Sequence, residues 1–181
     1  MNWRTRSRVA ESPTVREDGG LDLERLWRPW RMQYVSTAAG KDQGCIFCDH
    51  LAEADDIAAG ILHRTSSCFV IVNAFPYNTG HLMVAPIHHV AELDALSPET
   101  RGDLMELVTK TVAVVKEGFE PEGFNVGINL GAAGGAGVPG HLHVHVVPRW
   151  VGDTNFMSTI GGAKVLPELL ADTAARLRGL F

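Results

Sequence analysis

Cysteine and long apolar runs are both scarce in this sequence. It holds three cysteines among 181 residues, which is poor material for the disulfide framework of a small secreted domain. There is no run of about 18 apolar residues, so we expect no membrane-spanning helix. Nor does the start contain the apolar core of about 7 to 15 residues that a secretory signal needs. The reducing cytoplasm is therefore the expected location.

Excess positive charge is missing as well. Lysine and arginine number 16 against 21 acidic residues, a net charge of −5, which argues against a general nucleic-acid binder. The hydrophobic share of 45% and the charged share of 20% are ordinary for a globular protein. We assign residues 1–20, where arginines stand among Ser, Thr and Pro, to a flexible N-terminal tail. Residues 21–181 are expected to form a single domain.

A histidine-rich stretch in the last third of the chain has the strongest pattern. From His141 to Arg149 it reads HLHVHVVPR, and the alternation of imidazole and aliphatic side chains has the period of a half-buried strand. The three imidazoles, of His141, His143 and His145, are therefore expected side by side on one face, in a cleft. Pro148 is expected to end the strand pairing because it has no N–H to donate.

This spacing favours acid–base or nucleophilic chemistry over one shared metal ion. Side chains two apart on a strand are about 6.6 to 6.8 Å apart, which places His141 and His145 about 13 Å apart. Two ligands so far apart can hardly share a zinc ion, whose bonds to nitrogen are about 2.0 to 2.1 Å long. Histidine titrates near pH 6.5 and offers a neutral lone pair. The plainer alternative is a set of structural histidines, and it is disfavoured because three imidazoles lie in register on one face.

Cys45 and Cys48 form a C-x-x-C pair. Two thiolates at this spacing can bind one zinc ion and need two further ligands to complete a tetrahedron. A thioredoxin-like redox pair is the alternative, and it is expected between a strand and a helix, whereas this pair follows a polar linker at 40–44. We therefore favour zinc. Cys68 lies in an apolar run and is expected to pack in the core.

Apolar patterns elsewhere predict further strands and helices. Strands are expected at 61–64, 68–72, 81–85 and 124–130. A long helix is expected from the N-cap Ser97 to a stop at Gly118, with a short helix near 23–30 and a terminal one over 164–180. Together these elements predict an α+β fold with a five-stranded, mainly antiparallel sheet, covered by one long helix plus a C-terminal helix.

The loop from Gly131 to Gly140 reads GAAGGAGVPG. Gly135, Gly137 and Gly140 match G-x-G-x-x-G, but a dinucleotide fingerprint needs a helix after it, and this loop leads into a strand. Its backbone amides could approach an anion closely. A tight structural crossover explains the glycines equally well.

The H-x-H-x-H stretch resembles the signature of the histidine triad (HIT) superfamily of nucleotide hydrolases and transferases. NAFPYNTGHLMVAP at 73–86, LWRPWRMQY at 26–34 and RWVGDTNFM at 149–157 are similar to its bacterial branch of diadenosine tetraphosphate phosphorylases or hydrolases. The resemblance covers roughly residues 21–181. It implies a HIT-like fold and a homodimer.

The resemblance also implies an activity on dinucleoside polyphosphates such as diadenosine tetraphosphate, through a covalent nucleotidyl-histidine. His143 would attack the α-phosphate, His145 would support the leaving oxygen, and His141 would fix the strand or bind zinc. Water as acceptor makes a hydrolase, inorganic phosphate makes a phosphorylase, and neither needs a catalytic metal. The alternatives are a nucleoside phosphoramidase of the same superfamily, a non-enzymatic adenine-nucleotide sensor and a metal-dependent hydrolase.

Carried over by position, the resemblance implies a structural zinc site, for which His88 is the alternative to His89 as a ligand. Its ligands would be Cys45, Cys48, His89 and His141. Related proteins often carry Gln or Ser where this chain has Gly137, a departure that bears on phosphate contact. The candidate substrate-binding residues are Asn73, His81, Asn129, Gly135, Gly137, Trp150 and Lys164.

Overall fold

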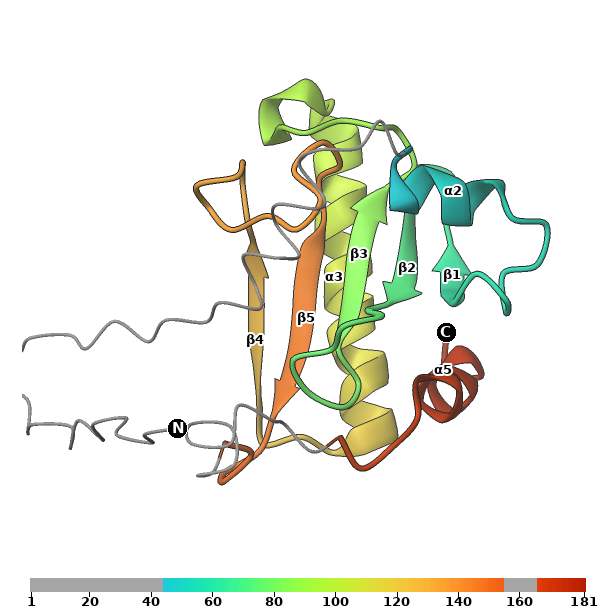
Figure 1. The fold of residues 1–181 in the computed structure, drawn as a ribbon, viewed down its shortest axis with the longest axis vertical. Helices are drawn as coiled ribbons and strands as arrows, with labels where there is room; N and C mark the ends of the chain where they lie inside the picture. The colour runs from blue at the N-terminus through green and yellow to red at the C-terminus, as the bar shows by residue number, and fades with distance from the viewer. Residues whose placement is uncertain (1–43, 155–165) are drawn as a thin grey trace, which may run out of the picture. The chain divides into compact units, whose positions relative to one another are not determined.

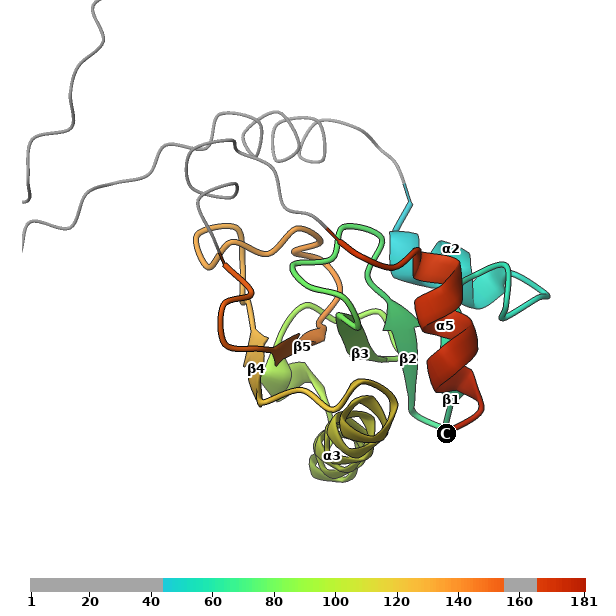
Figure 2. The same ribbon diagram turned by 90° about the horizontal axis from the view of Figure 1, so that it is seen from below.

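The computed structural model describes residues 44–154 and 166–181. Their architecture is an α+β layer in which five antiparallel strands form one sheet, in the order β1-β2-β3-β5-β4, and α3 crosses one face of it (Figures 1 and 2). This confirms the predicted fold class. The strands are β1 (Ile61–Arg64), β2 (Cys68–Val72), β3 (Leu82–Pro86), β4 (Gly123–Ile128) and β5 (Val144–Arg149). The helices are α2 (Ile46–Ala52), the short 3-10 turn η1 (Leu93–Ala95), α3 (Pro98–Phe119) and α5 (Leu170–Arg178).

The strands alternate their side chains between two apolar clusters, one on each face of the sheet. The cluster under α3 includes Cys68, Val70, Leu82, Val84, Leu142, Val144, Val146, Leu104, Leu107 and Val115. Cys68 therefore packs in the core, as predicted. The cluster on the other face, beside α2, is built by Phe47, Ala59, Ile61, Phe69, Ile71, Met83 and Ala85. Because strand side chains alternate, the imidazoles that separate Leu142, Val144 and Val146 lie on the α2 side.

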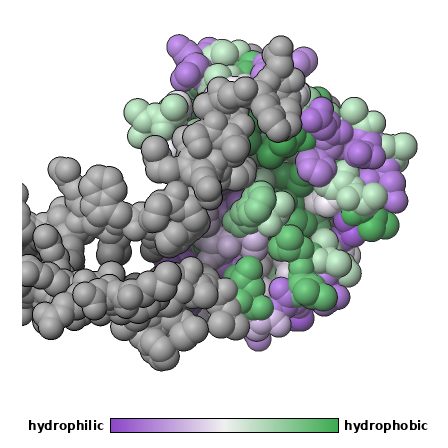
Figure 3. Space-filling model, viewed as in Figure 1, coloured by the Kyte–Doolittle hydropathy of each residue, from purple (hydrophilic) through white to green (hydrophobic). Residues whose placement is uncertain are grey.

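The side of the molecule that carries α2 is the one turned to the viewer in Figure 1. Hydrophobic residues show over the strands there, and hydrophilic residues gather over α2 and the loop that follows it (Figure 3). The described part of the chain contains no helix that is long and apolar enough to cross a membrane.

Helix α3 begins where the sequence predicts. The Ser97 hydroxyl accepts a hydrogen bond from the backbone N–H of Thr100 at 3.1 Å, which satisfies one of the free donors of the first turn. Pro98 occupies the first helical position, where a missing N–H removes no hydrogen bond.

The predicted stop of α3 at Gly118 is wrong. The helix continues to Phe119, and Glu120 takes the left-handed conformation that ends it, with φ of 46°. Gly118 has a packing role instead, because a Cβ atom there would lie 2.6 Å from the Leu177 side chain of α5. The glycine therefore lets α5 approach α3 closely.

Strand β5 differs from the predicted strand at both ends. It begins at Val144, so the first two histidines lie in the irregular segment before it, and it ends at Arg149. The prediction that Pro148 ends the pairing is therefore wrong. Strand β3 pairs with β5 only as far as Val146, whereas β4 pairs with it through Arg149. The missing N–H of Pro148 thus removes no hydrogen bond between β3 and β5.

Helix α2 was not predicted, because seven residues are too few to show an apolar period. The C-terminal helix spans Leu170–Arg178 and is shorter than the expected 164–180. The tail at 1–20, the short helix expected near 23–30 and the LWRPWRMQY motif lie outside the described residues, so the domain division stays a prediction.

Candidate functional site

The three triad histidines, His141, His143 and His145, follow one another on the α2 side of the sheet. The ring centroids of His143 and His145 are 4.9 Å apart, edge to face. His141 is 1% exposed and His143 is 4% exposed, whereas His145 is half-buried. The expectation that all three imidazoles face an open cleft is therefore wrong for His141 and His143, which are buried, and the segment becomes accessible only at His145.

His143 is held in one tautomer. Its Nδ1 lies 2.8 Å from the backbone carbonyl oxygen of His141. A carbonyl can only accept, so Nδ1 carries the hydrogen and donates it. The lone pair of the neutral ring is therefore on Nε2. Burial lowers the pKa of His143 because it disfavours the charged imidazolium, which keeps that lone pair available near neutral pH.

A chain of hydrogen bonds sets the tautomer of His145. The backbone N–H of Tyr77 donates to Nδ1 of His81 at 3.0 Å, so His81 carries its hydrogen on Nε2. That Nε2 lies 3.0 Å from Nδ1 of His145 and donates to it. The hydrogen of neutral His145 is therefore on Nε2. Burial lowers the pKa of His81 to about 3, with His145 and His143 adding to the effect, so His81 is neutral.

Two residues of the NAFPYN segment support this chain. Asn73 is buried, its Nδ2 lies 3.3 Å from both ring nitrogens of His81, and its Oδ1 accepts from the N–H of Phe75. The structure thus places Asn73 and His81 beside the triad. The Tyr77 ring lies 4.7 Å from the ring of His81 and 5.7 Å from that of His145. The sequence analysis missed Tyr77, although an aromatic residue before the Gly-His pair was a usable signal.

The remaining substrate-binding candidates are dispersed. Asn129 follows Ile128, which pairs with Val144, so Asn129 lies at the level of the central histidine in the sheet. Gly137 is half-buried in the glycine loop. The loop amide of Gly135 donates to the carbonyl of Ala132 at 3.1 Å. That N–H closes a turn within the loop, and contact of Gly135 with substrate stays a prediction.

Trp150 lies away from the triad. It lines a hollow of about 530 Å³ together with Asn78, Phe119 and Asp153, and none of the triad histidines lines that hollow. Lys164 lies outside the described residues. The structure therefore brings Asn73 and His81 into contact with one another and, through His81, with His145, and it leaves Trp150 at the far end of β5.

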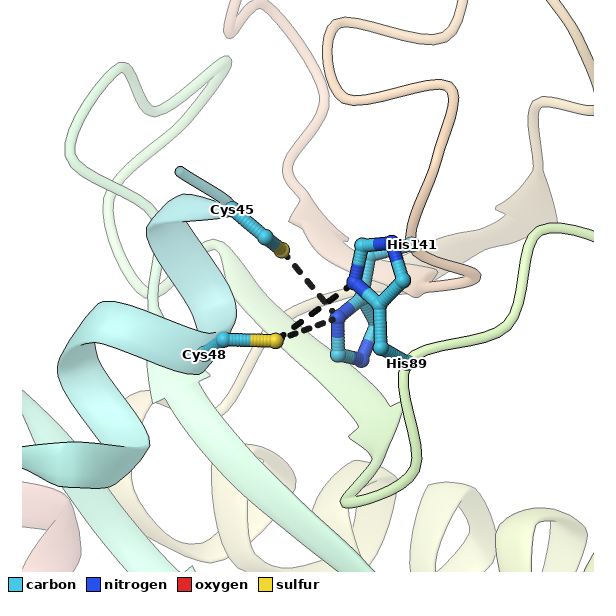
Figure 4. Close-up of side chains that lie close together, drawn as sticks. All are labelled: Cys45, Cys48, His89 and His141. Carbon is cyan, nitrogen blue, oxygen red and sulfur yellow. Dashed lines mark hydrogen bonds between the residues drawn. The ribbon is translucent and has the colours of Figure 1, made fainter. Parts of the chain in front are cut away.

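The four predicted metal ligands converge in one cluster (Figure 4). The Sγ of Cys45 lies 3.2 Å from Nδ1 of His141, and the Sγ of Cys48 lies 3.4 Å from Nδ1 of His89. All four candidate ligand atoms are within 4.8 Å of one another. The cluster contains His89 and not its neighbour His88, so the geometry favours His89.

Local structure explains why these atoms can bind a cation. Cys45 is the N-cap of α2 and Cys48 stands one turn later, so both sulfurs face the same way. Nε2 of His141 donates to the carbonyl of Pro86 at 2.8 Å, which leaves the lone pair on Nδ1, the atom that faces the sulfurs. Burial and neighbouring Cys45 raise the pKa of Cys48. Two sulfurs and two imidazole nitrogens are the donor set of a closed tetrahedral zinc site.

Fold and site together define an α+β protein that presents an H-x-H-x-H segment beside a possible metal site. Residues 54–151 match the HIT domain family. The chain is also 41% identical over 157 residues to an AP-4-A phosphorylase of Mycobacterium tuberculosis (strain ATCC 25618 / H37Rv), which covers 83% of this chain and 80% of that protein. The chain belongs to the HIT family.

Two further relatives place the chain within this family. It is 34% identical over 93 residues to the asymmetrical bis(5'-nucleosyl)-tetraphosphatase of Schizosaccharomyces pombe, covering 51% of this chain and 50% of that protein. The structure is similar to that of a HIT-like protein involved in cell-cycle regulation from Bartonella henselae. That match has a TM-score of 0.56 at 25% identity and covers 67% of this chain and 85% of the other. The Mycobacterium and Schizosaccharomyces relatives are, by their names, nucleotide-processing enzymes.

Proposed function

We propose that this protein cleaves dinucleoside polyphosphates of the diadenosine tetraphosphate type by transferring a nucleotidyl group to His143. The observation that carries the proposal is the hydrogen bond from Nδ1 of His143 to the carbonyl of His141. It directs the lone pair of a neutral imidazole to Nε2, the atom that would bond to the α-phosphorus. A covalent intermediate divides one difficult transfer into two easier ones.

The first step breaks one P–O bond and forms one P–N bond. As Nε2 of His143 bonds to phosphorus, the P–O bond breaks and the leaving polyphosphate oxygen departs with the electron pair as an anion, stabilised by a hydrogen bond from the N–H at Nε2 of His145. The orientation of His145 by neutral His81 supports this role, since it places the donor hydrogen on Nε2. Because His143 is buried, the phosphate has to approach on the side of His145.

The second step returns the ring of His143 to its starting state. The acceptor oxygen bonds to phosphorus, the P–N bond breaks with its electron pair returning to Nε2 of His143, and any proton that the acceptor loses passes to solvent. Water would make the protein a hydrolase, and inorganic phosphate would make it a phosphorylase. The 41% identity to an AP-4-A phosphorylase favours phosphate as the acceptor.

Trapping the intermediate tests the proposal. The wild type, incubated with diadenosine tetraphosphate labelled in the adenylyl group and then denatured at alkaline pH, where a P–N bond survives, should retain label on the protein, whereas His143→Ala should not. His88→Ala is the matched control, because it removes an exposed imidazole outside the triad. Equal labelling of wild type and His143→Ala would refute the assignment.

Product analysis with and without added phosphate distinguishes the acceptors. ADP plus ATP that appears only with phosphate means phosphorolysis, and AMP plus ATP means hydrolysis. Turnover of adenosine phosphoramidate without turnover of diadenosine tetraphosphate would establish the phosphoramidase instead. Binding without turnover of either compound would establish a nucleotide sensor.

We further propose that the cluster of Cys45, Cys48, His89 and His141 binds one structural zinc ion, which would pin α2 to the triad segment. The donor set and the free Nδ1 of His141 support this. Elemental analysis of purified protein should give one zinc per chain, and Cys45→Ser should lower that content. Full activity in a zinc-free, folded protein would exclude a metal-dependent hydrolase.

We propose a homodimer whose interface is the outer edge of β4, along which no strand of the described residues pairs. β4 lies at the end of the sheet, and Val126 in its middle is 45% exposed. An open strand edge can pair with a second copy. Light scattering of the eluted protein should show twice the chain mass, and Val126→Lys should shift it to one chain. A wild type that elutes as a single chain would exclude this assembly.

A further inference from the structure

Phe47 lies between the two cysteines of the C-x-x-C pair, and its ring contacts the triad itself. It is 1% exposed and belongs to α2, the helix that begins at the pair. Its ring centroid lies 5.1 Å from that of His141 and 5.0 Å from that of His143. Of the aromatic side chains described, Phe47 is the one that contacts both of these imidazoles.

The ring of His143 needs more than one restraint to present Nε2 in a fixed direction. The hydrogen bond from Nδ1 to the carbonyl of His141 fixes one atom of the ring, and the ring can still tilt about that point. His145 contacts it edge to face, at 4.9 Å and 75°. Phe47 contacts it at 5.0 Å with an angle of 44° between the planes. Together the two rings limit the tilt that the hydrogen bond leaves open.

We propose that Phe47 is a positioning residue for His143, which holds the imidazole in the orientation that keeps Nδ1 on the carbonyl and Nε2 directed at phosphorus. The kinetic part of this inference rests on the proposed nucleotidyl transfer. The orientation of the ring does not, and it can be measured without substrate. Reactions of bound groups are sensitive to such placement, since a displacement of about 1 Å can cost roughly 100-fold in rate.

A purely structural role is the competing explanation. Phe47 also packs edge-on against Phe69 of β2, with centroids 6.2 Å apart, inside the apolar cluster on the α2 side. Phe69 is 0% exposed and shares that cluster without a described ring contact to either imidazole. Phe69→Leu therefore removes similar volume from the same cluster and is the matched control for Phe47→Leu.

The experiment compares Phe47→Ala, Phe47→Leu, Phe69→Leu and the wild type, all at equal zinc content. Long-range ¹H–¹⁵N spectra at one fixed pH report the tautomer of His143, whose signal is identified by its loss in His143→Ala. We expect one tautomer in wild type and Phe69→Leu, and a mixture of both neutral tautomers in the Phe47 variants. We expect kcat to fall roughly 10-fold or more in Phe47→Ala and less in Phe47→Leu, with KM changed less than about twofold.

Each outcome decides the inference. A folded Phe47→Ala or Phe47→Leu protein with the wild-type tautomer and kcat overturns it, and so does a Phe69→Leu protein that loses both to the same extent. Should Phe47→Ala fail to fold, Phe47→Leu against Phe69→Leu carries the comparison. Should the wild type turn over no dinucleoside polyphosphate, the proposed function fails, and the tautomer measurement alone still supports or overturns the role of Phe47.

Discussion

Lowering the pH should destabilise the protein through His81, by an amount that the structure allows us to calculate. His81 is 1% exposed, and its folded pKa is about 3, below the value of about 6.5 expected in the unfolded chain. Between these two values the unfolded state binds one more proton than the folded state. The stabilisation is therefore complete above about pH 6.5 and is lost as the pH falls toward 3.

One pKa unit corresponds to about 1.4 kcal/mol, so lowering the pH from about 7 to about 5 should cost roughly 2 kcal/mol of unfolding free energy through His81 alone. Urea unfolding at both pH values gives the change in unfolding free energy of wild type and of His81→Gln. Subtracting the second change from the first isolates the contribution of His81, because the contributions of the other titrating groups cancel. His88→Gln, at an exposed position, controls for the loss of one imidazole. Equal pH dependence in wild type and His81→Gln would refute the claim that His81 is buried and neutral.

Three other substitutions test the remaining structure. Ser97→Ala removes the cap of α3 and should lower the unfolding free energy by about 0.5 to 2 kcal/mol in urea titrations. Leu104→Ala removes a core side chain that is 1% exposed and should cost about 2 to 5 kcal/mol, whereas Met105→Ala, 53% exposed on the same helix, should cost far less. Cys48→Ser should lower the zinc content and the melting temperature together, and a chelator should then change the melting temperature of wild type more than that of the variant.

The sequence predicts most of the sheet and of α3 because their signals are local. Short apolar runs bounded by turn residues predict β1, β2 and β3 to within one residue, and the Ser97-Pro98 pair marks the start of α3. Gly118 was misread as a helix stop because its reason lies in Leu177, a residue far along the chain. Pro148 was misread because whether a missing N–H matters depends on which neighbouring strand is present at that level.

In the candidate site, too, the features set by short segments are predictable from the sequence, and those set by tertiary contacts are not. The H-x-H-x-H spacing predicts imidazoles on one face, and the C-x-x-C pair predicts ligands, since both are properties of short segments. The tautomers of His143 and His145 depend on tertiary contacts with a carbonyl and with His81, which no spacing reveals. Phe47 was overlooked because a lone aromatic residue between cysteines has no pattern of its own.

The metal cluster joins parts of the chain that are far apart in sequence, since Cys45 and His141 are separated by 96 residues. If the metal acts as a cross-link does, closing a loop of that length raises the free energy of the unfolded chain by about 4 to 5 kcal/mol, because the chain loses conformational entropy. The ligands come from α2, from the segment after β3 and from the segment before β5, so the cluster is complete only when all three parts are in place. We expect α2 to be the first part that a protease can reach once the metal is removed.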